Sequence, residues 1–398
     1  MRYVLAAFLT SCVLGVPAFA QNNAVKIGVL DDMSGVYADN TGPGDVQSVK
    51  FAIEDFGGSV LGKPIEMVSA DFQNKVDVGV GIAKRWYDEE NVDLVLGVPN
   101  SAVALALVKV ADEKNRVFMP TAAATSALTG AGCGANTVHF IYDTYGQTKT
   151  IVNALGKQGI DTWYFITVDY VFGQSIETDA TAFIKAAGGK ILGSVKHPLN
   201  SQDFSSYELQ AQASKAKGLI FANGGNDIVN GVKQAAEFGL MKSMRVSAPL
   251  AQFPDVHSIG LKIAQGLLIS SPFYYDMTPE ARAYTDRFTK AMGRPPSFIQ
   301  AGTYGAVMHY LKAVKAAGTD EAKAVMAQMK KMPINDFMTK NGIVRADGRV
   351  IRDMYLMEAK SPAESKGPWD LAKMVATVPG KEAFRPINEG GCKLVAGN

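Results

Sequence analysis

Small and hydroxyl-bearing residues occur in three clusters that could hold an anionic group. The clusters are Ser34 to Tyr37, Asn100 with Ser101, and Ala123, Ala124 and Thr125 within the stretch 120–126. Hydroxyl groups and unpaired backbone N–H groups at the start of a helix bind anions such as carboxylates. Ser, Thr and Asn are also the ordinary N-cap residues of helices, so each one alone favours a capping role. Because three such clusters follow neighbouring strands, anion binding and helix capping are equally favoured for the set as a whole.

Aromatic residues follow two strands that are predicted in the second half of the chain. Tyr170 and Phe172 come after the apolar run 163–168, and Phe273 comes after the run 267–269. Aromatic rings at strand ends could form the walls of a pocket for a flat, apolar ligand. An aromatic core or a contact between lobes is the alternative, and the residues themselves do not separate the two.

The sequence lacks the residue constellations of common enzyme classes. Its four histidines are not spaced from one another, or from Cys or Glu, as zinc ligands are. It has no G-x-S-x-G motif and no P-loop, and the glycines of 130–134 do not connect a strand to a helix. Asp31 and Asp32 lie at the end of a predicted strand, and their position favours a structural role in the following loop at least as much as a functional role. We therefore expect no catalytic residue, no metal and no cofactor.

Strand and helix patterns alternate along the first part of the chain and would position these clusters. Strands are predicted at 25–30, 65–70, 94–97 and 117–119, the first of them a mostly apolar run typical of a buried strand, and helical spacing occupies 46–56, 76–89 and 101–114. A βαβ series of this kind predicts an α/β fold in which helices cover both faces of a parallel sheet.

The same alternation restarts after residue 140 and predicts a second lobe of like architecture. Strands are expected at 163–168, 191–195, 219–222 and 267–269, and helices at 148–155, 176–187 and 228–238. Helices at 279–292, 299–317 and 322–332 are too few for a third domain and should pack on one of the lobes. The tail after Lys360 is rich in Pro, Gly and Lys and is predicted to be irregular.

The amino terminus predicts export. Arg2 precedes a mostly apolar stretch, 4–16, and a small-x-small cleavage site at 18–20. The apolar stretch is shorter than the roughly 20 residues that span a bilayer, so a membrane anchor is the less favoured alternative. No later segment is long and apolar enough to span. We expect residues 1–20 to be a signal peptide that is cleaved after Ala20, and the mature protein to be periplasmic.

Composition and cysteine content limit the partners and the compartment. The chain has 398 residues, of which 47% are hydrophobic and 20% charged, a length and composition that favour two domains. Loss of Arg2 lowers Lys+Arg from 40 to 39 against 38 acidic residues, and without a basic block we expect no nucleic-acid partner. Cys12 leaves with the signal peptide. In an oxidising compartment Cys133 and Cys392 favour one disulfide over two buried thiols.

The chain resembles type I periplasmic solute-binding proteins of ABC importers, in the branched-chain amino acid group, from about Val25 to Ala359. Five stretches carry the resemblance by their order and spacing: 26–29 with Ser34-Gly35, 120–126 with 128–129, Asp169-Tyr170-x-Phe172-Gly173, 265–268, and Thr303-Tyr304-Gly305-Ala306. The resemblance implies two Rossmann-like lobes that close around a ligand and are joined by crossings near Tyr142, Ser271 and Met354. Residues 24–142 and 272–353 would then form the first lobe, and 143–271 and 354–398 the second.

The resemblance also implies roles for individual residues. In amino-acid-binding members, hydroxyls and backbone N–H groups hold the ligand carboxylate at positions that match Ser101, Ala123 and Thr125. An aromatic residue that matches Phe172 covers the ligand. A carboxylate that pairs with the ligand ammonium is expected where this sequence has Leu250. An ammonium buried there without a partner would be strongly disfavoured, which favours an aromatic acid of the benzoate or phenylpropenoid type.

Asn226 and Tyr304 complete the predicted binding set. A branched-chain amino or keto acid is the alternative ligand, and a ligand-sensing receptor with the same fold is the alternative function. We expect a monomer that delivers its carboxylate ligand to a membrane permease by hinge closure.

Overall fold

The first lobe is built on a five-stranded sheet in the order β2-β3-β1-β4-β5. The computed structural model describes residues 23–395. The strands are β1 (Val25–Asp31), β2 (Ser59–Val60), β3 (Lys63–Asp71), β4 (Leu94–Gly97) and β5 (Val117–Met119), and the helices are α1 (Gly42–Phe56), α2 (Val76–Asp88) and α3 (Ser101–Lys114). All pairs are parallel except the β2–β3 hairpin, and the register places Ile27 opposite Leu94 and Leu94 opposite Val117. The apolar runs predicted as buried strands are strands.

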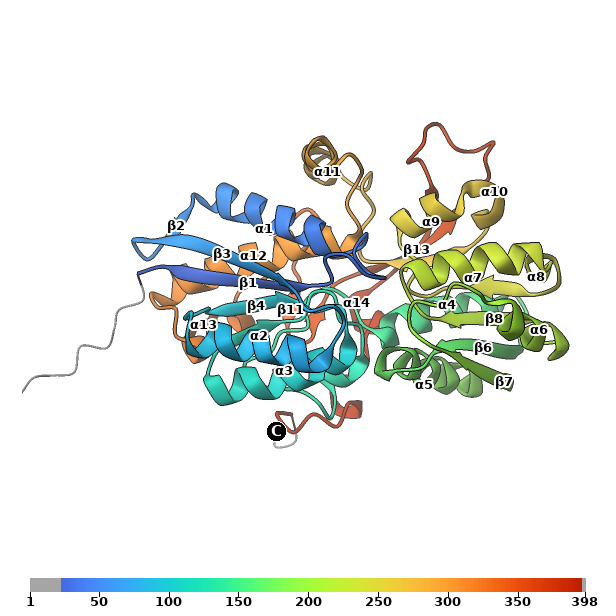
Figure 1. Ribbon diagram of the computed structural model, residues 1–398, viewed down its shortest axis with the longest axis horizontal. Coiled ribbons are helices and arrows are strands. Elements are labelled where there is room, and N and C mark those ends of the chain that lie inside the picture. The colour runs from blue at the N-terminus through green and yellow to red at the C-terminus, as the bar shows by residue number, and fades with distance from the viewer. Residues whose placement is uncertain (1–22, 396–398) are drawn as a thin grey trace, which may run out of the picture.

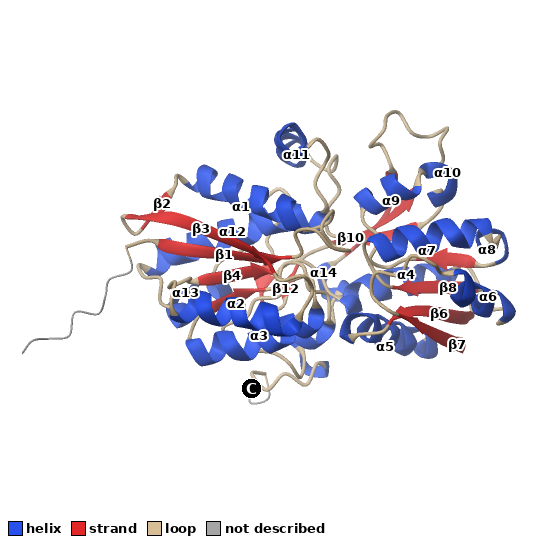
Figure 2. Ribbon diagram, in the orientation of Figure 1, coloured by secondary structure: helices blue, strands red, loops and turns tan. Residues whose placement is uncertain are grey.

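The second lobe is built on a four-stranded parallel sheet in the order β7-β6-β8-β9. Its strands are β6 (Thr162–Val168), β7 (Lys190–His197), β8 (Gly218–Ala222) and β9 (Arg245–Ser247). Its helices are α4 (Thr144–Lys157), α5 (Val171–Ala186), α6 (Ser205–Ala213), α7 (Asn226–Glu237), α8 (Leu240–Ser243), α9 (Phe253–Ile259) and α10 (Leu261–Ala264). The two sheets lie at opposite ends of an elongated molecule, and the strands of both point toward its middle (Figure 2).

Three helices from late in the chain return to the first lobe, as the sequence predicts. They are α11 (Pro279–Met292), α12 (Phe298–Ala317) and α13 (Ala322–Lys331). The long α12 packs along α1 and against α13. In Figure 1 the orange α12 lies beside the blue α1, although the two helices are far apart in the sequence. Helix α12 begins with a capping box in which Ser297 and Gln300 satisfy each other's backbone N–H groups.

A separate three-stranded antiparallel sheet, in the order β10-β13-β14, packs against helix α4 of the second lobe. Its strands are β10 (Leu268–Ser271), β13 (Met354–Ala359) and β14 (Ala372–Val378), and a short hairpin of β11 (Ile343–Val344) and β12 (Val350–Ile351) precedes β13. The prediction of an irregular tail after Lys360 is wrong, because β14 pairs with β13 over its whole length and α14 (Gly380–Ala383) follows. Strand β14 lies at the edge of its sheet, where most of its side chains are exposed. Its β-favouring residues, Met374 to Val378, signal a strand that the prediction overlooked because Pro, Gly and Lys dominate the rest of the tail.

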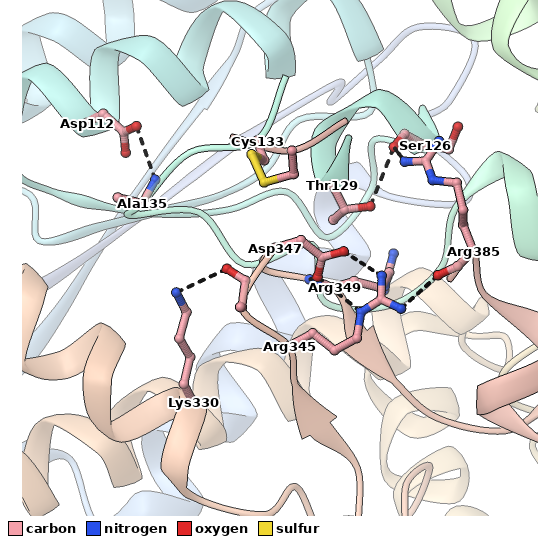
Figure 3. Close-up of a disulfide and its surroundings, with 12 residues drawn as sticks. Asp112, Ser126, Thr129, Cys133, Ala135, Lys330, Arg345, Asp347, Arg349 and Arg385 are labelled. Carbon is pink, nitrogen blue, oxygen red and sulfur yellow. Dashed lines mark hydrogen bonds and ion pairs between the residues drawn. A yellow bond between two sulfur atoms is a disulfide. The ribbon is translucent and has the colours of Figure 1, made fainter. Parts of the chain in front are cut away.

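The tail crosses from the second lobe to the first and ends in a disulfide. Strand β14 runs back toward the middle of the molecule, and Arg385 then donates from Nη2 to the carbonyl of Ser126 at 2.8 Å. The structure joins Cys133 to Cys392 with a Cα–Cα distance of 5.7 Å, and Figure 3 shows this bond beside the Ser126 loop. The tail thus adds a fourth connection to the three crossings of the chain. The lobe boundaries at 142, 271 and 353 stay predictions, and the signal peptide, with Cys12, lies outside the described residues.

Candidate functional site

A small cavity of about 20 Å³ lies between the two lobes, at the carboxyl ends of both parallel sheets. Its first-lobe walls are Tyr37, Asn40, Thr41, Pro99, Ala122, Ala124, Tyr142 and Ile299, and its second-lobe walls are Phe172, Gly224, Gly225, Leu250 and Gln252. This volume holds about one water molecule, so a larger ligand requires the walls to move apart. Open α/β sheets bind ligands in this position because the loops after the strands meet there.

Six helices begin at this cavity. Their N-cap residues are Thr41 of α1, Asn100 of α3, Tyr170 of α5, Gly225 of α7, Gln252 of α9 and Ser297 of α12. Each N-cap lines the cavity or lies within two residues of a lining residue. In α1, α5 and α7 the N-cap side chain makes no capping bond. The N-terminal ends of helices carry partial positive charge and unpaired N–H donors, so this arrangement favours an anionic group.

No Lys, Arg, Asp or Glu among the described residues lines the cavity. Buried acids lie behind the walls: Asp255 accepts hydrogen bonds from the lining residues Asn40 and Gln252, and Asp31 ends β1, where burial raises its pKa to about 6. Burial and the neighbouring charge of Asp31 also raise the pKa of Asp45 well above its usual value. Two buried carboxyls without a cation favour sharing a proton over carrying two charges. The positive character of the cavity therefore comes from helix ends and not from basic side chains.

The lobes touch each other across the cavity rim. The hydroxyls of Tyr37 and Tyr170 lie 2.6 Å apart, one from each lobe. Asn40 donates from Nδ2 to Oδ1 of Asp255 at 2.9 Å, also across the lobes. These bonds join the two lobes directly beside the cavity, as in the closed form of a hinged binding protein.

Three further cross-lobe hydrogen bonds lie at the two flanks of the rim. The Thr125 and Ser175 hydroxyls are 2.6 Å apart, and Ser126 donates to Asp179 at 3.0 Å. Burial raises the pKa of the Asp179 carboxyl to about 6. On the other flank the backbone N–H of Asn226 donates to the Val36 carbonyl at 3.2 Å.

The backbone is constrained where β4 meets α3. Gly97 has φ +92°, and a Cβ there would lie 2.8 Å from the Leu30 carbonyl oxygen, so only glycine fits. Val98 adopts φ +59°, which is rare for a β-branched residue. Strain of this kind occurs at functional sites that the surrounding structure holds in place. It sets the position of Pro99, which lines the cavity, and of the helix start behind it.

Comparison with known proteins supports this geometry. A family model described as periplasmic binding protein matches residues 24–368. The chain belongs to the periplasmic binding protein family. It is similar to a periplasmic binding protein of Burkholderia mallei, with 47% identity, a TM-score of 0.92 and coverage of 94% of this chain and 99% of the other. It is also similar to a branched-chain amino acid ABC transporter periplasmic ligand-binding protein of Burkholderia xenovorans LB400, with 40% identity, a TM-score of 0.83 and coverage of 93% and 99%.

A third structure shares the fold at lower identity. It is a solute-binding protein of an ABC transporter from Rhodopseudomonas palustris BisB5, solved in complex with 3,4-dihydroxybenzoic acid. Its identity is 21%, its TM-score is 0.82, and the match covers 90% of this chain and 98% of the other. This periplasmic binding protein is thus a solute-binding component of an ABC importer and not an enzyme, and its family works with a membrane permease. In the described part of the chain no helix meets the length and hydropathy needed to cross a bilayer, and no group of three metal-ligating side chains occurs.

The predicted binding residues of this periplasmic binding protein divide into three groups. Tyr37, Ala124, Phe172 and Leu250 line the cavity. Five more adjoin it: Asn100 and Ser101 at the start of α3, Ala123 and Thr125 beside Ala124, and Tyr170 against Tyr37. The Ser101 hydroxyl accepts from the Thr125 N–H at 3.3 Å, so these two predicted anchors contact each other.

Four predicted residues lie away from the cavity, each for a physical reason. The exposed Ser34 donates to Asp71, and Tyr304 donates to Asp55 among the rings of the first lobe. Phe273 is fully buried against Phe337 in the core. Asn226 has an exposed side chain at the start of α7, and its backbone makes the cross-lobe bond to Val36.

The sequence interpretation missed nine lining residues. They are Asn40, Thr41, Pro99, Ala122, Tyr142, Gly224, Gly225, Gln252 and Ile299. Applying the strand-end rule to β8 would have found the two glycines, which follow it almost directly. Ile299 had no such signal, because it reaches the site from the returning helix α12.

Proposed function

We propose that this protein captures a small aromatic carboxylate by hinge closure and presents the closed form to a membrane permease as a monomer. The observation that carries the proposal is the convergence of six helix N-termini on a cavity without charged lining residues. Helix ends and N–H groups would hold the carboxylate in the absence of a basic side chain.

The remainder of the cavity suits an apolar, flat body. Phe172, Leu250 and Ile299 line it, and Phe172 packs against Tyr170 with ring centroids 5.8 Å apart. Burial of a ring against these side chains adds apolar stabilisation to the anchored head group. The dihydroxybenzoic acid complex of the R. palustris relative supports this ligand class.

A branched-chain amino acid is the second candidate, and the name of the B. xenovorans relative favours it. An amino acid would bring an ammonium group into a cavity where no described carboxylate is a lining residue. Leu250 occupies the place expected for that carboxylate by resemblance. An ammonium without a partner is strongly disfavoured in a closed cavity, so we rank this ligand second.

Isothermal titration calorimetry of the mature protein with benzoate, benzamide and leucine tests the proposal. We expect benzoate-class acids to bind at least about 30-fold more tightly than the matching amides, because charge-assisted hydrogen bonds are stronger than neutral ones. Equal affinity for acid and amide would remove the carboxylate anchor, and tight binding of leucine alone would select the second candidate.

A further inference from the structure

We propose that the outer end of the second lobe binds an anionic amphiphile, a molecule that carries one negative head group on a single apolar chain. The site is a groove formed by the end of α7, by α8 and α10, and by the residues that begin β9 and precede β10. Figure 1 shows α8 and α10 at the end of the second lobe that lies away from the first lobe. No described residue of the first lobe lines the groove, so it is separate from the hinged cleft.

The groove has an apolar floor. Its volume is about 450 Å³, which lies within the range of small-molecule sites. Its apolar lining residues are Ala236, Met241, Met244, Val246, Ile263 and Leu267. Met244, Val246 and Leu267 are buried in the core of the lobe, whereas Met241 and Ile263 are half-buried along the walls. Burial of an alkyl chain on such a floor raises affinity by about 4-fold for each methylene group.

Three cations line the same groove, and no acidic residue among the described ones does. They are Lys242, Arg245 and Lys262. Arg245 donates from Nη2 to the Gly266 carbonyl at 2.9 Å, which holds its guanidinium against the groove wall. None of the three forms an ion pair with another described residue. Unpaired cations beside an apolar floor favour a ligand that combines an anion with an apolar body.

Compensation of helix dipoles explains the two lysines poorly. Lys242 and Lys262 lie in the last turns of α8 and α10, and each of these helices has four residues. A single turn aligns few peptide dipoles, so little negative charge gathers at its end. Both lysines are exposed, and their ammonium groups can reach a ligand head group without breaking a bond within the described part of the chain.

The neighbouring strand starts add positive charge to this end of the lobe. Strand β7 begins at Lys190, and Lys215 and Lys217 precede β8. The register of the parallel sheet places these starts at the same edge as Arg245. Lys217 is paired with Asp161 at 2.9 Å, and the other two lysines form no ion pair with described residues. A local excess of positive charge attracts an anion toward the groove before contact.

A free single-chain amphiphile fits this groove better than a membrane surface does. The groove is concave and its buried floor lies behind the cations, so an apolar chain has to enter it to reach Val246 and Leu267. Lipid chains in a bilayer stay in the hydrocarbon region behind their head groups. We therefore assign the groove to an alkyl carboxylate, with octanoate as the probe.

Calorimetric titration of the mature protein with octanoate, octanol and octylammonium tests the site. We expect octanoate to bind at least about 10-fold more tightly than octanol, because charge-assisted hydrogen bonds are stronger than neutral ones. Octylammonium should bind more weakly than either. Affinity should rise about 3- to 4-fold for each methylene group from hexanoate to octanoate, and a flat series would overturn the role of the apolar floor.

Two variants with the same change in net charge locate the binding. The groove variant combines Lys242→Gln, Arg245→Gln and Lys262→Gln. The control variant removes three exposed lysines of the first lobe by combining Lys84→Gln, Lys109→Gln and Lys290→Gln. The ratio of octanoate affinity to octanol affinity should fall to within about 3-fold of unity in the groove variant and stay unchanged in the control.

Titrations repeated with saturating benzoate separate the groove from the cleft. Octanoate should bind equally with and without benzoate, and benzoate should bind both variants equally. Displacement of octanoate by benzoate, or a preference for octanoate that survives in the groove variant, would overturn the groove site. Cosedimentation with phosphatidylglycerol vesicles without binding of octanoate would overturn it in favour of a membrane surface. If benzoate does not bind, the proposed function fails, while the groove variant still decides the octanoate site.

Discussion

Replacement of Gly225 by alanine should block closure of the lobes. Gly225 has φ +58° and lies in the second lobe at the cavity, where a Cβ atom would be 2.2 Å from the Val36 carbonyl oxygen of the first lobe. Carbon–oxygen contacts need about 3.3 Å, so the lobes would have to separate by about 1 Å at this point.

The expected loss of affinity follows from the bonds that this separation breaks. The Asn226 N–H to Val36 bond and the Tyr37–Tyr170 bond lie next to the clash. Each contributes about 1 kcal/mol, so closure would lose about 2 kcal/mol and the dissociation constant would rise about 30-fold. Gly225 has φ +58° and ψ −136°, a region that essentially only glycine adopts, so alanine there should also lower the stability of the variant by about 1–3 kcal/mol, independent of the ligand.

Gly239→Ala is the matched control, because Gly239 has φ +75° and open space around its missing Cβ. Calorimetry should show near-normal affinity in the control and the 30-fold loss in Gly225→Ala. Small-angle X-ray scattering should show that ligand compacts the control and not the variant. Equal affinities in the two alanine variants would refute closure at this contact.

Three other perturbations have defined outcomes. Changing Cys133 and Cys392 together to serine should lower the melting temperature by about 7 °C in calorimetry, because the bond spans 259 residues and the chain-entropy model gives about 5.5 kcal/mol; a shift below 1 °C would contradict this. Phe172→Ala should weaken aromatic acids about 10–100-fold in titrations and leave small aliphatic acids less affected, since it removes a buried ring from the wall. Burial, and then the charges of neighbouring acids, raise the pKa of Glu208 to about 8, so stability should fall as pH rises from about 5 to 8. The free energy of unfolding from urea denaturation should therefore be about 1–3 kcal/mol larger for Glu208→Gln than for the unmodified protein at pH 9. At pH 5 the two free energies of unfolding should be equal.

The sequence predicts the central strands of both parallel sheets because each is a short apolar run. It misses β9 at the edge of the second-lobe sheet, and the run 267–269 that it assigns to the second lobe forms β10, which pairs with β13 in the separate antiparallel sheet. The strands at 94–97 and 117–119 and the helix at 101–114 agree with the structure residue by residue. The sequence does not predict β14, whose side chains face solvent. It also does not predict the small helices α8 and α10, which are too short to show a helical hydrophobic period.

The cavity is predicted in part, because strand ends place loops but not side-chain directions. Ala123 and Ala124 are neighbours in sequence, yet only Ala124 faces the cavity while Ala123 packs into a different core cluster. Adjacent residues of an extended segment point to opposite sides, and a shift of one residue exchanges their environments. The prediction that Tyr304 lines the cavity fails for a similar reason, because its motif lies on α12 but its ring turns toward Asp55.

The discontinuity of the first lobe imposes an order on folding. Its sheet ends at Met119, but the helix that covers α1 begins only at Phe298, after the whole second lobe. The second-lobe sheet and its helices need only the continuous stretch from Thr144 to Ala264. A chain that emerges from its amino terminus can therefore form the second-lobe sheet while the apolar side of α1 is still without its cover. Helix α4 then receives β13 and α14 only after α12 has emerged, so both lobes depend on segments made late in synthesis.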